Sequence, residues 1–322
     1  MGGYNIMKNN LIDNHKLKDD IQIISMDFGR GYTKIVTEYN GKSYEAKFKS
    51  VAGLGRDIDL SKYKKPIYIK VDGEDYFIGD LALKQSHDPI RNSRDSKTSR
   101  TVQTLFCAAL SELAFADKVK VIFTVPNDSY SKTVLKEIEA TYKGKTFTVK
   151  DNITNTIKSV EVVDVSIFRE SDAIYYHVFG SRTNDDKNVT MCSIGFKTTE
   201  ISSFNVGGMF DDRYSTTIHY GQQDILSYVR TQLKNDGIIK DLADIDDNNT
   251  DYNEYKKQAN EWATESIIQK IESFLPNEGK EYDVFIGGGT SLLLEFDNSF
   301  IKVDDPQMAT AKGAYYVATM IF

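Results

Sequence analysis

Three glycine-containing segments constrain the fold of this chain more than any other feature. They are residues 27–34, 193–199 and 287–290, and each directly follows an apolar run suited to a buried strand. Glycine at the end of a strand permits a tight turn and lets the backbone approach another group closely. Because the segments are spread along the whole chain, they predict that the ends of several strands contribute to one site.

The first segment, residues 27–34, is predicted to form the bend of a hairpin. Gly29 and Gly31 fit that bend because glycine reaches positive φ without steric cost. Backbone N–H groups in such a turn point into one concavity, which favours anions and phosphates above all. Lys34 can add a point charge to a phosphate, and Asp27 is placed to hold a hydrated Mg²⁺ beside it. The alternative interpretation is a surface hairpin with a solvated Asp27.

The second half of the chain opens as the first does, with an apolar strand, a glycine turn that contains Lys and Thr, and another strand. This weak internal repeat divides the chain near residue 185. Two related domains would each offer one turn to the phosphates of a nucleotide, and the triple glycine 287–289 would approach the base or ribose. Ligand clefts commonly lie between domains. We therefore expect an α/β fold with a nucleotide clamped between two domains.

Composition and charge narrow the class of protein. The length of 322 residues suggests two domains, and the formal net charge of -7 argues against a broad, non-specific grip on nucleic acid. Cys107 and Cys192 have no metal-ligand spacing and are interpreted as buried thiols in a reducing compartment. No apolar run is long enough to span a bilayer, and no secretory signal is present. We expect a soluble, cytoplasmic protein that contacts neither a membrane nor nucleic acid directly.

Periodicity predicts the order of the helices and strands. Strands are expected at residues 21–49, 67–78, 119–125, 143–165, 189–201, 204–209 and 283–286. Helices are expected at residues 79–83, 101–116, 131–141, 170–179, 222–234, 252–275 and 309–322. Residues 241–251 are interpreted as an acidic linker and residues 1–20 as a flexible tail. The basic run 88–100 is interpreted as a solvated loop, with a contact to a neighbouring subunit as the alternative.

Motifs in a fixed order give the chain a resemblance to a known family. It resembles the actin-like ATPases of plasmid segregation, the ParM/StbA group of the actin, heat-shock chaperone and sugar-kinase superfamily, from about residue 21 to residue 322. The most specific matches are Phe285-Ile-Gly-Gly-Gly289 and Asp305-Pro-Gln-Met-Ala-Thr-Ala-Lys-Gly313. The other matching stretches are residues 27–34, 76–82, 168–171 and 193–200.

The resemblance implies a two-domain actin-like, or ribonuclease H-like, fold in which each domain is a mixed five-stranded sheet flanked by helices. Domain I would span residues 21–182 and include the returning C-terminal helix 306–322, and domain II would span residues 183–305. ATP or GTP would lie with Mg²⁺ in the cleft. Subunits would join head to tail into filaments, since heterologous contacts give open polymers. The implied partner is a DNA-bound adaptor protein of a plasmid partition system.

The matched motifs also imply roles for individual residues. Asp27 would organise Mg²⁺ through water, and Glu170 would be the catalytic residue that positions or polarises the attacking water. The alternative for Glu170 is a helix N-terminal carboxylate favoured by the macrodipole. The nucleotide would be held by Asp27, Gly29, Arg30, Gly31, Tyr32, Thr33, Lys34, Gly195, Phe196, Lys197, Thr198, Gly287, Gly288, Gly289 and Thr290.

Departures from the family pattern bear on hydrolysis. Ser193 stands where the family carries Asp, and a serine cannot supply the charge that helps to order Mg²⁺ and the water. The dipeptide Phe196-Lys197 makes the second loop bulkier and more basic, and its lysine could contact a phosphate. Arg30 replaces a small hydroxyl residue and could reach the phosphates directly. Hydrolysis is therefore expected to be slow, or to depend on Glu170 and Glu200.

Three functions compete. The first is a filament-forming ATPase that moves plasmid DNA through its adaptor, which suits the acidic net charge because the adaptor would meet the DNA. The second is a small-molecule kinase of the same superfamily, although no residue can be identified as the base that activates an acceptor. The third is a nucleotide-binding scaffold with weak hydrolysis, which the serine at position 193 would favour.

Overall fold

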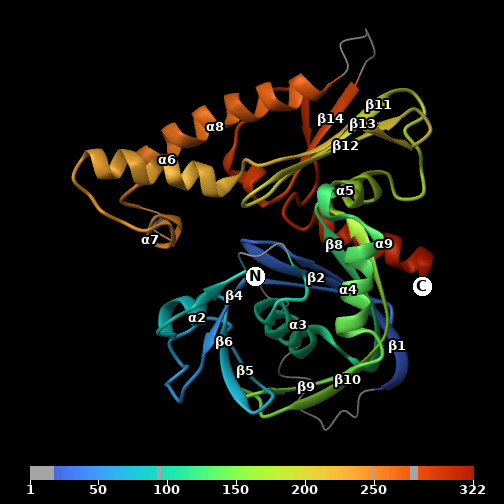
Figure 1. Ribbon diagram of the computed structural model, residues 1–322, viewed down its shortest axis with the longest axis vertical. Coiled ribbons are helices and arrows are strands. Elements are labelled where there is room, and N and C mark those ends of the chain that lie inside the picture. The colour runs from blue at the N-terminus through green and yellow to red at the C-terminus, as the bar shows by residue number, and fades with distance from the viewer. Residues whose placement is uncertain (1–17, 93–95, 248–249, 276–281) are drawn as a thin grey trace.

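The structure is a computed structural model that describes residues 18–92, 96–247, 250–275 and 282–322. It contains two α/β lobes, one from each half of the chain, and helices α5 (Glu170–Phe179) and α9 (Ala309–Ile321) lie where the lobes meet (Figure 1). The α/β class predicted from the sequence is confirmed.

The first lobe is built on a ten-stranded sheet with the order β3-β2-β1-β8-β10-β9-β5-β6-β4-β7. Strand β1 pairs antiparallel with β2 and parallel with β8, and β8 pairs parallel with β10. The bounds are β1 (Lys18–Phe28), β2 (Tyr32–Tyr39), β3 (Lys42–Lys49), β4 (Val51–Leu54), β5 (Ile67–Val71), β6 (Glu74–Ile78), β7 (Ile90–Arg91), β8 (Ala116–Val125), β9 (Thr146–Asp151) and β10 (Ile157–Arg169).

The second lobe is built on a five-stranded sheet with the order β13-β12-β11-β14-β15. Strand β11 pairs antiparallel with β12 and parallel with β14, and β14 pairs parallel with β15. This arrangement repeats the run β3-β2-β1-β8-β10 of the first sheet, which continues beyond those five strands. The bounds are β11 (Asn188–Ile194), β12 (Thr199–Asn205), β13 (Met209–Ile218), β14 (Tyr282–Gly287) and β15 (Phe300–Lys302).

Helices bury apolar faces against both sheets. In the first lobe, Phe106 of α3 lies 6.0 Å from Phe123 and 4.7 Å from Tyr142, measured between ring centroids. The remaining bounds are α2 (Asp80–Gln85), α3 (Arg100–Leu113), α4 (Lys132–Tyr142), α6 (Gln222–Asn235), α7 (Leu242–Asp247), α8 (Asn253–Phe274) and the 3₁₀ turns η1 (Asn127–Ser129) and η2 (Gly289–Leu293). Within the described ranges, no helix combines the length and the apolar character that crossing a bilayer requires.

Residues at positive φ form several of the turns. Asn40 (φ 51°) and Gly41 (φ 69°) join β2 to β3, as the Asn-Gly pair predicts for a type I′ hairpin. Gly207 (φ 84°) and Gly208 (φ 76°) join β12 to β13. The strand predicted at 204–209 is therefore wrong, because the chain reverses there and the third strand begins only at Met209.

Two other predictions need correction. The acidic stretch 241–251 is not only a linker, because residues 242–247 form α7, whose Ile245 is fully buried among apolar neighbours. Of the predicted tail 1–20, residues 18–20 belong to β1, and residues 1–17 lie outside the described residues.

Helix α9 packs directly on the backbone of α5, which explains its small residues. A Cβ built on Gly313 would lie only 1.7 Å from the carbonyl oxygen of Ala173, so no side chain fits at this position. Ala311, Ala314 and Ala318 of the same helix are completely buried. The small side chains thus let the last helix of the chain lie against both α5 and β1.

We expect Gly313→Ala to lower the free energy of unfolding by about 2 kcal/mol or more, because overpacking forces the helices apart. Met320→Ala is the matched control on the same helix, since Met320 is 53% exposed, and it should change stability by less than about 0.5 kcal/mol. Urea denaturation of both variants measures the difference. Equal effects would contradict the close packing of α9 on α5.

Candidate functional site

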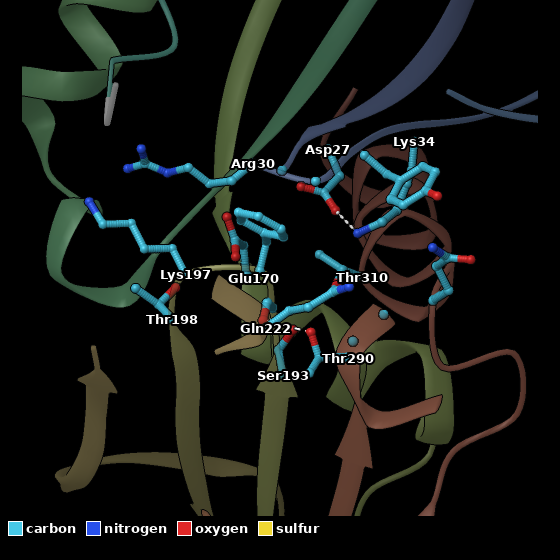
Figure 2. A pocket seen from close by; sticks show the side chains of 18 of the residues that line it. Asp27, Arg30, Lys34, Glu170, Ser193, Lys197, Thr198, Gln222, Thr290 and Thr310 are labelled. Carbon is cyan, nitrogen blue, oxygen red and sulfur yellow. Dashed lines mark hydrogen bonds and ion pairs between the residues drawn. The ribbon is translucent and has the colours of Figure 1, made fainter. Parts of the chain in front are cut away.

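One pocket lies between the lobes and brings together most of the predicted site residues. Those that line it are Asp27, Gly29, Arg30, Gly31, Tyr32, Lys34, Glu170, Gly195, Phe196, Lys197, Thr198, Gly288, Gly289 and Thr290. Figure 2 shows side chains from the first lobe, such as Asp27 and Lys34, on one side of this space and Ser193 and Thr290 on the other. The glycine loops of the two lobes therefore face each other.

Two predicted residues lie behind the wall of the pocket. Thr33 is fully buried, and its hydroxyl lies 2.9 Å from the hydroxyl of Ser50. A Cβ built on Gly287 would lie 2.7 Å from Cδ1 of Ile174, so Gly287 is in contact with α5. Neither residue lines the pocket, and their contact with a nucleotide stays a prediction.

Gly29 is needed for space rather than for positive φ, whereas neither requirement applies to Gly31. Neither Gly29 nor Gly31 is among the residues at positive φ, which corrects the reason given from the sequence. A Cβ on Gly29 would lie 2.9 Å from the carbonyl oxygen of Tyr32. A Cβ on Gly31 would lie 3.5 Å from Cβ and Cδ2 of Phe196, in the opposite lobe. The first loop is therefore tight, and the phenyl ring of the second loop lies against it.

Asp27 and Lys34 form a largely buried ion pair at the end of β1. They face each other across the β1–β2 hairpin, and Nζ of Lys34 lies 2.6 Å from Oδ2 of Asp27 (Figure 2). Thr124 donates to Oδ1 of the same carboxylate at 2.9 Å. Burial opposes ionisation of Asp27, but the charges of Lys34 and Lys97 and these hydrogen bonds together lower its pKa. Asp27 is therefore a fixed anion in the wall of the pocket.

Glu170 is the first residue of α5 and has the opposite titration behaviour. Burial raises its pKa to about 8, helped by the negative charges of Asp27 and Glu200 and opposed by the charge of Lys97. Nζ of Lys97 lies 3.9 Å from Oε1 of Glu170. A carboxyl group poised near neutral pH inside a cleft is suited to proton transfer.

The basic run 88–100 is not simply a solvated loop, which corrects the interpretation made from the sequence. Lys97 is 8% exposed and donates to the carbonyl oxygen of Phe28 at 3.1 Å. Asn92 is also buried, and its amide donates to the same carbonyl at 3.2 Å. Both residues line the pocket. Tertiary packing buries these two side chains, and the charge pattern of the sequence does not indicate that burial.

The second loop is held in place by hydrogen bonds to its own lobe. The N–H of Gly195 donates to the carbonyl of Thr198 at 2.8 Å, which closes a tight turn. The carbonyl of Gly195 accepts from the hydroxyl of Thr290 at 2.7 Å. Backbone N–H groups at the start of α6 donate to the carbonyls of residues 195 and 196. These hydrogen bonds hold the loop to its own lobe, with Ser193 and Lys197 lining the pocket.

The third loop, at Gly288, is held by the Asp-Pro-Gln motif that follows it in the sequence. Gly288 has φ 85°, and a Cβ there would lie 2.3 Å from the carbonyl oxygen of Ile194. Its N–H donates to the carbonyl of Pro306 at 2.8 Å, so the Asp-Pro-Gln motif holds the glycine loop. Gln307 and Thr310 of this motif also line the pocket. The motif is recognisable in the sequence, but a role for these two side chains in the site was not predicted from it.

Glu200 does not line the pocket. Its side chain is buried, and Oε2 accepts from the backbone N–H of Asn127 at 3.0 Å and from Thr217 at 2.6 Å. Asn127 belongs to the first lobe, so this carboxylate joins the lobes beneath the site. Its influence on the pocket is electrostatic, through Glu170.

The residues present fit a Mg²⁺ ion only if it takes most of its ligands from water and phosphate. Among the described residues, no group of three or more His, Cys, Asp or Glu side chains could hold a metal. Asp27 is the carboxylate at the start of the first loop, and Lys34 and Thr124 already contact its oxygens. Mg²⁺ commonly keeps several waters and uses one or two carboxylates with substrate phosphates, so Asp27 could serve through water.

Comparisons with known proteins agree with this fold. Residues 25–171 match the family model for the actin-like proteins N-terminal domain. The fold is similar to the archaeal actin homologue Ta0583, at 16% identity over 93% of this chain and 99% of that chain, with a TM-score of 0.77. It is also similar to pCBH ParM in a non-polymerisable quadruple mutant, at 18% identity over 94% and 100%, with a TM-score of 0.76.

A structure of ParM from Bacillus thuringiensis with ATP is similar as well, at 13% identity over 94% of this chain and 99% of that chain, with a TM-score of 0.65. No curated protein sequence matched the chain. The resemblance and the two-domain actin-like fold predicted from the sequence are therefore confirmed.

Proposed function

We propose that this chain, which has an actin-like N-terminal domain and the two-lobed actin-like fold, binds and hydrolyses ATP or GTP between its lobes and forms filaments. One observation carries the proposal: glycine loops from both lobes line a single pocket that also contains Asp27, Lys34 and Glu170. Backbone N–H groups and a buried lysine suit the phosphates of a nucleotide.

The roles of the side chains follow from their positions. Lys34 and the loop containing Gly29 and Gly31 would hold the phosphates, and the loop at Gly288 would lie against the base or ribose. Asp27 would hold a hydrated Mg²⁺, which supplies charge neutralisation to the phosphates when bound. Glu170 would accept a proton from the attacking water or orient it, since its pKa lies near neutral pH.

The arrangement of the two sheets supports the domain bounds expected from the sequence. We propose domain I at residues 21–182 with 306–322 and domain II at residues 183–305. The first sheet ends at Arg169 and the second begins at Asn188, which supports a boundary between these residues. Helix α9 packs against β1 and β8 of the first sheet, which supports its return to domain I.

The biological role we propose is plasmid segregation by head-to-tail filaments that attach to DNA through a DNA-bound adaptor. Similarity to ParM proteins supports this role. The net charge of -7 also suits a filament that leaves contact with DNA to another protein.

Sedimentation and light scattering test the proposal. Purified protein should form pelletable polymer with ATP or GTP and Mg²⁺ and should form none without nucleotide. A protein that stays monomeric with both nucleotides over a wide concentration range would contradict filament formation. Release of phosphate, followed in the same samples, measures hydrolysis.

A nucleotide-binding scaffold with weak hydrolysis is the second candidate, and a specific observation favours it. From β11 to the end of the chain, the described residues that line the pocket include no carboxylate. Tight binding of ATP without release of phosphate would select this candidate.

A further inference from the structure

The ionisable side chains that line the pocket carry more positive than negative charge. Its described lining residues include two carboxylates, those of Asp27 and Glu170. They also include four basic side chains, those of Arg30, Lys34, Lys97 and Lys197. With every group ionised, the basic charges exceed the acidic ones by two.

The two carboxylates are also poorly available for direct coordination of a metal ion. Both oxygens of Asp27 accept hydrogen bonds, one from Lys34 and the other from Thr124. Glu170 lies close to Lys97, and its raised pKa keeps it largely protonated at neutral pH. A polyanion that enters this pocket can therefore contact basic side chains directly, whereas the carboxylates offer little direct coordination to Mg²⁺.

Arg30 and Lys197 are placed to neutralise the far end of a bound triphosphate. They come from the glycine loops of opposite lobes, and both extend past Glu170, on the side away from Lys34 (Figure 2). Burial lowers the pKa of Arg30, and the charge of Glu170 acts on it in the opposite direction, which places the guanidinium near that carboxyl group. If Glu170 faces the terminal phosphate, as proposed above, these two cations flank the same phosphate.

We infer that Arg30 and Lys197 clamp the terminal phosphate directly, so that the chain binds a nucleoside triphosphate tightly without a divalent metal ion. An arginine presents a planar set of donors to phosphate oxygens, and a lysine adds a point charge. Together they neutralise the charge of the terminal phosphate, which a metal ion otherwise does. The inference rests on the proposed nucleotide site. It adds that these two side chains take the place of the metal ion during binding.

Equilibrium binding of a non-hydrolysable ATP analogue tests the inference. Calorimetry with the full chain is run once with Mg²⁺ and once with EDTA. For the wild type, we expect the two dissociation constants to differ by less than about tenfold. In the double variant Arg30→Gln/Lys197→Gln, binding in EDTA should weaken by about 100-fold, roughly tenfold for each charge-assisted contact. Binding with Mg²⁺ should weaken much less.

Two controls separate this effect from a general loss of charge or fold. The variant Lys143→Gln/Lys187→Gln removes one exposed lysine from each lobe. These lysines pair with Asp164 and Asp283, which do not line the pocket. This variant should therefore leave both dissociation constants unchanged. Binding of ADP in EDTA should weaken less than that of the triphosphate in the double variant, since ADP lacks the terminal phosphate. Circular dichroism and thermal unfolding check that each variant is folded.

The outcomes distinguish this inference from the proposed function. The wild type could bind tightly with Mg²⁺ and more than about 100-fold more weakly in EDTA. That result would overturn the inference but would still support the proposed nucleotide site. An equal loss with Mg²⁺ and with EDTA in the double variant would also overturn it. Absence of binding under both conditions in the wild type would overturn both the inference and the proposed function.

Discussion

Glu170→Gln should slow ATP hydrolysis by about 10²–10⁴-fold while it leaves the affinity for the nucleotide within a few-fold of the wild type. Glutamine keeps the shape and hydrogen-bonding capacity of the side chain but cannot take a proton. The change removes a group that sits at the start of α5, beside Lys97 and inside the pocket. Single-turnover measurement of phosphate release, together with the dissociation constant, separates chemistry from binding.

Glu139→Gln is the matched control, because Glu139 is a partly exposed glutamate of α4 that lies 3.8 Å from Lys143 and does not line the pocket. It should leave both the rate and the affinity unchanged. A Glu170→Gln variant that retains more than about a tenth of the wild-type rate would show that Glu170 is a helix N-terminal carboxylate without a role in the chemistry.

The pH profile of the wild type follows from the same residue. Burial raises the pKa of Glu170 to about 8 in the protein without nucleotide. Only the ionised carboxylate can accept a proton, and it becomes abundant as the pH rises through that value. We therefore expect kcat/KM to increase about tenfold between pH 7 and pH 9 and then to level off. The Glu170→Gln variant should lose this rise, whereas a rate that falls over this range would contradict the assignment of a base.

Lys34→Met should weaken binding of ATP by about 100-fold and also reduce stability. The lysine lies 2.6 Å from Asp27, and the two side chains are only 12% and 4% exposed. Removing one partner of a buried ion pair leaves an uncompensated charge, at a cost of about 3–5 kcal/mol. Calorimetry measures the affinity, and urea denaturation measures the free energy of unfolding.

The double variant Asp27→Asn/Lys34→Met separates the two effects. It removes both charges, so most of the stability lost in the single variant should return. Affinity for ATP should stay low, because no point charge is left at this position to contact a phosphate. Recovery of binding together with stability would mean that Lys34 acts only as the partner of Asp27.

Local patterns were sufficient to predict much of the fold. The Asn40-Gly41 turn, the helix that begins at Glu170 and the small-residue helix near the C-terminus all have short-range causes. The acidic stretch that forms α7 was missed because its short helix is stabilised by burial of Ile245 in the core of the second lobe. Intrinsic preference gives way to tertiary packing in such short segments.

The candidate site was predictable where one motif supplies several side chains, as between Asp27 and Lys34. It was not predictable where the fold brings in a residue from elsewhere. Lys97 lies in a charged stretch that resembles a solvated loop, yet it is buried beside Glu170. Gly29 and Gly31 were identified for a conformational reason, whereas the carbonyl oxygen of Tyr32 leaves no room for a side chain at Gly29, and Gly31 lies in ordinary contact with Phe196. Such contacts across the molecule leave no periodic signal in the sequence.

The central claim is that the glycine loops of the two lobes face each other and hold a triphosphate between them, and a cross-link tests it most directly. A Cβ at position 31 would lie 3.5 Å from Cβ of Phe196, a separation that suits a disulfide. The two native cysteines, Cys107 and Cys192, are free and buried, so they should not compete. Mass spectrometry under non-reducing conditions follows the bond in a Gly31→Cys/Phe196→Cys variant. We expect the disulfide to form readily and a non-hydrolysable ATP analogue to slow its formation, whereas failure of the two thiols to join in the folded protein would contradict the claim.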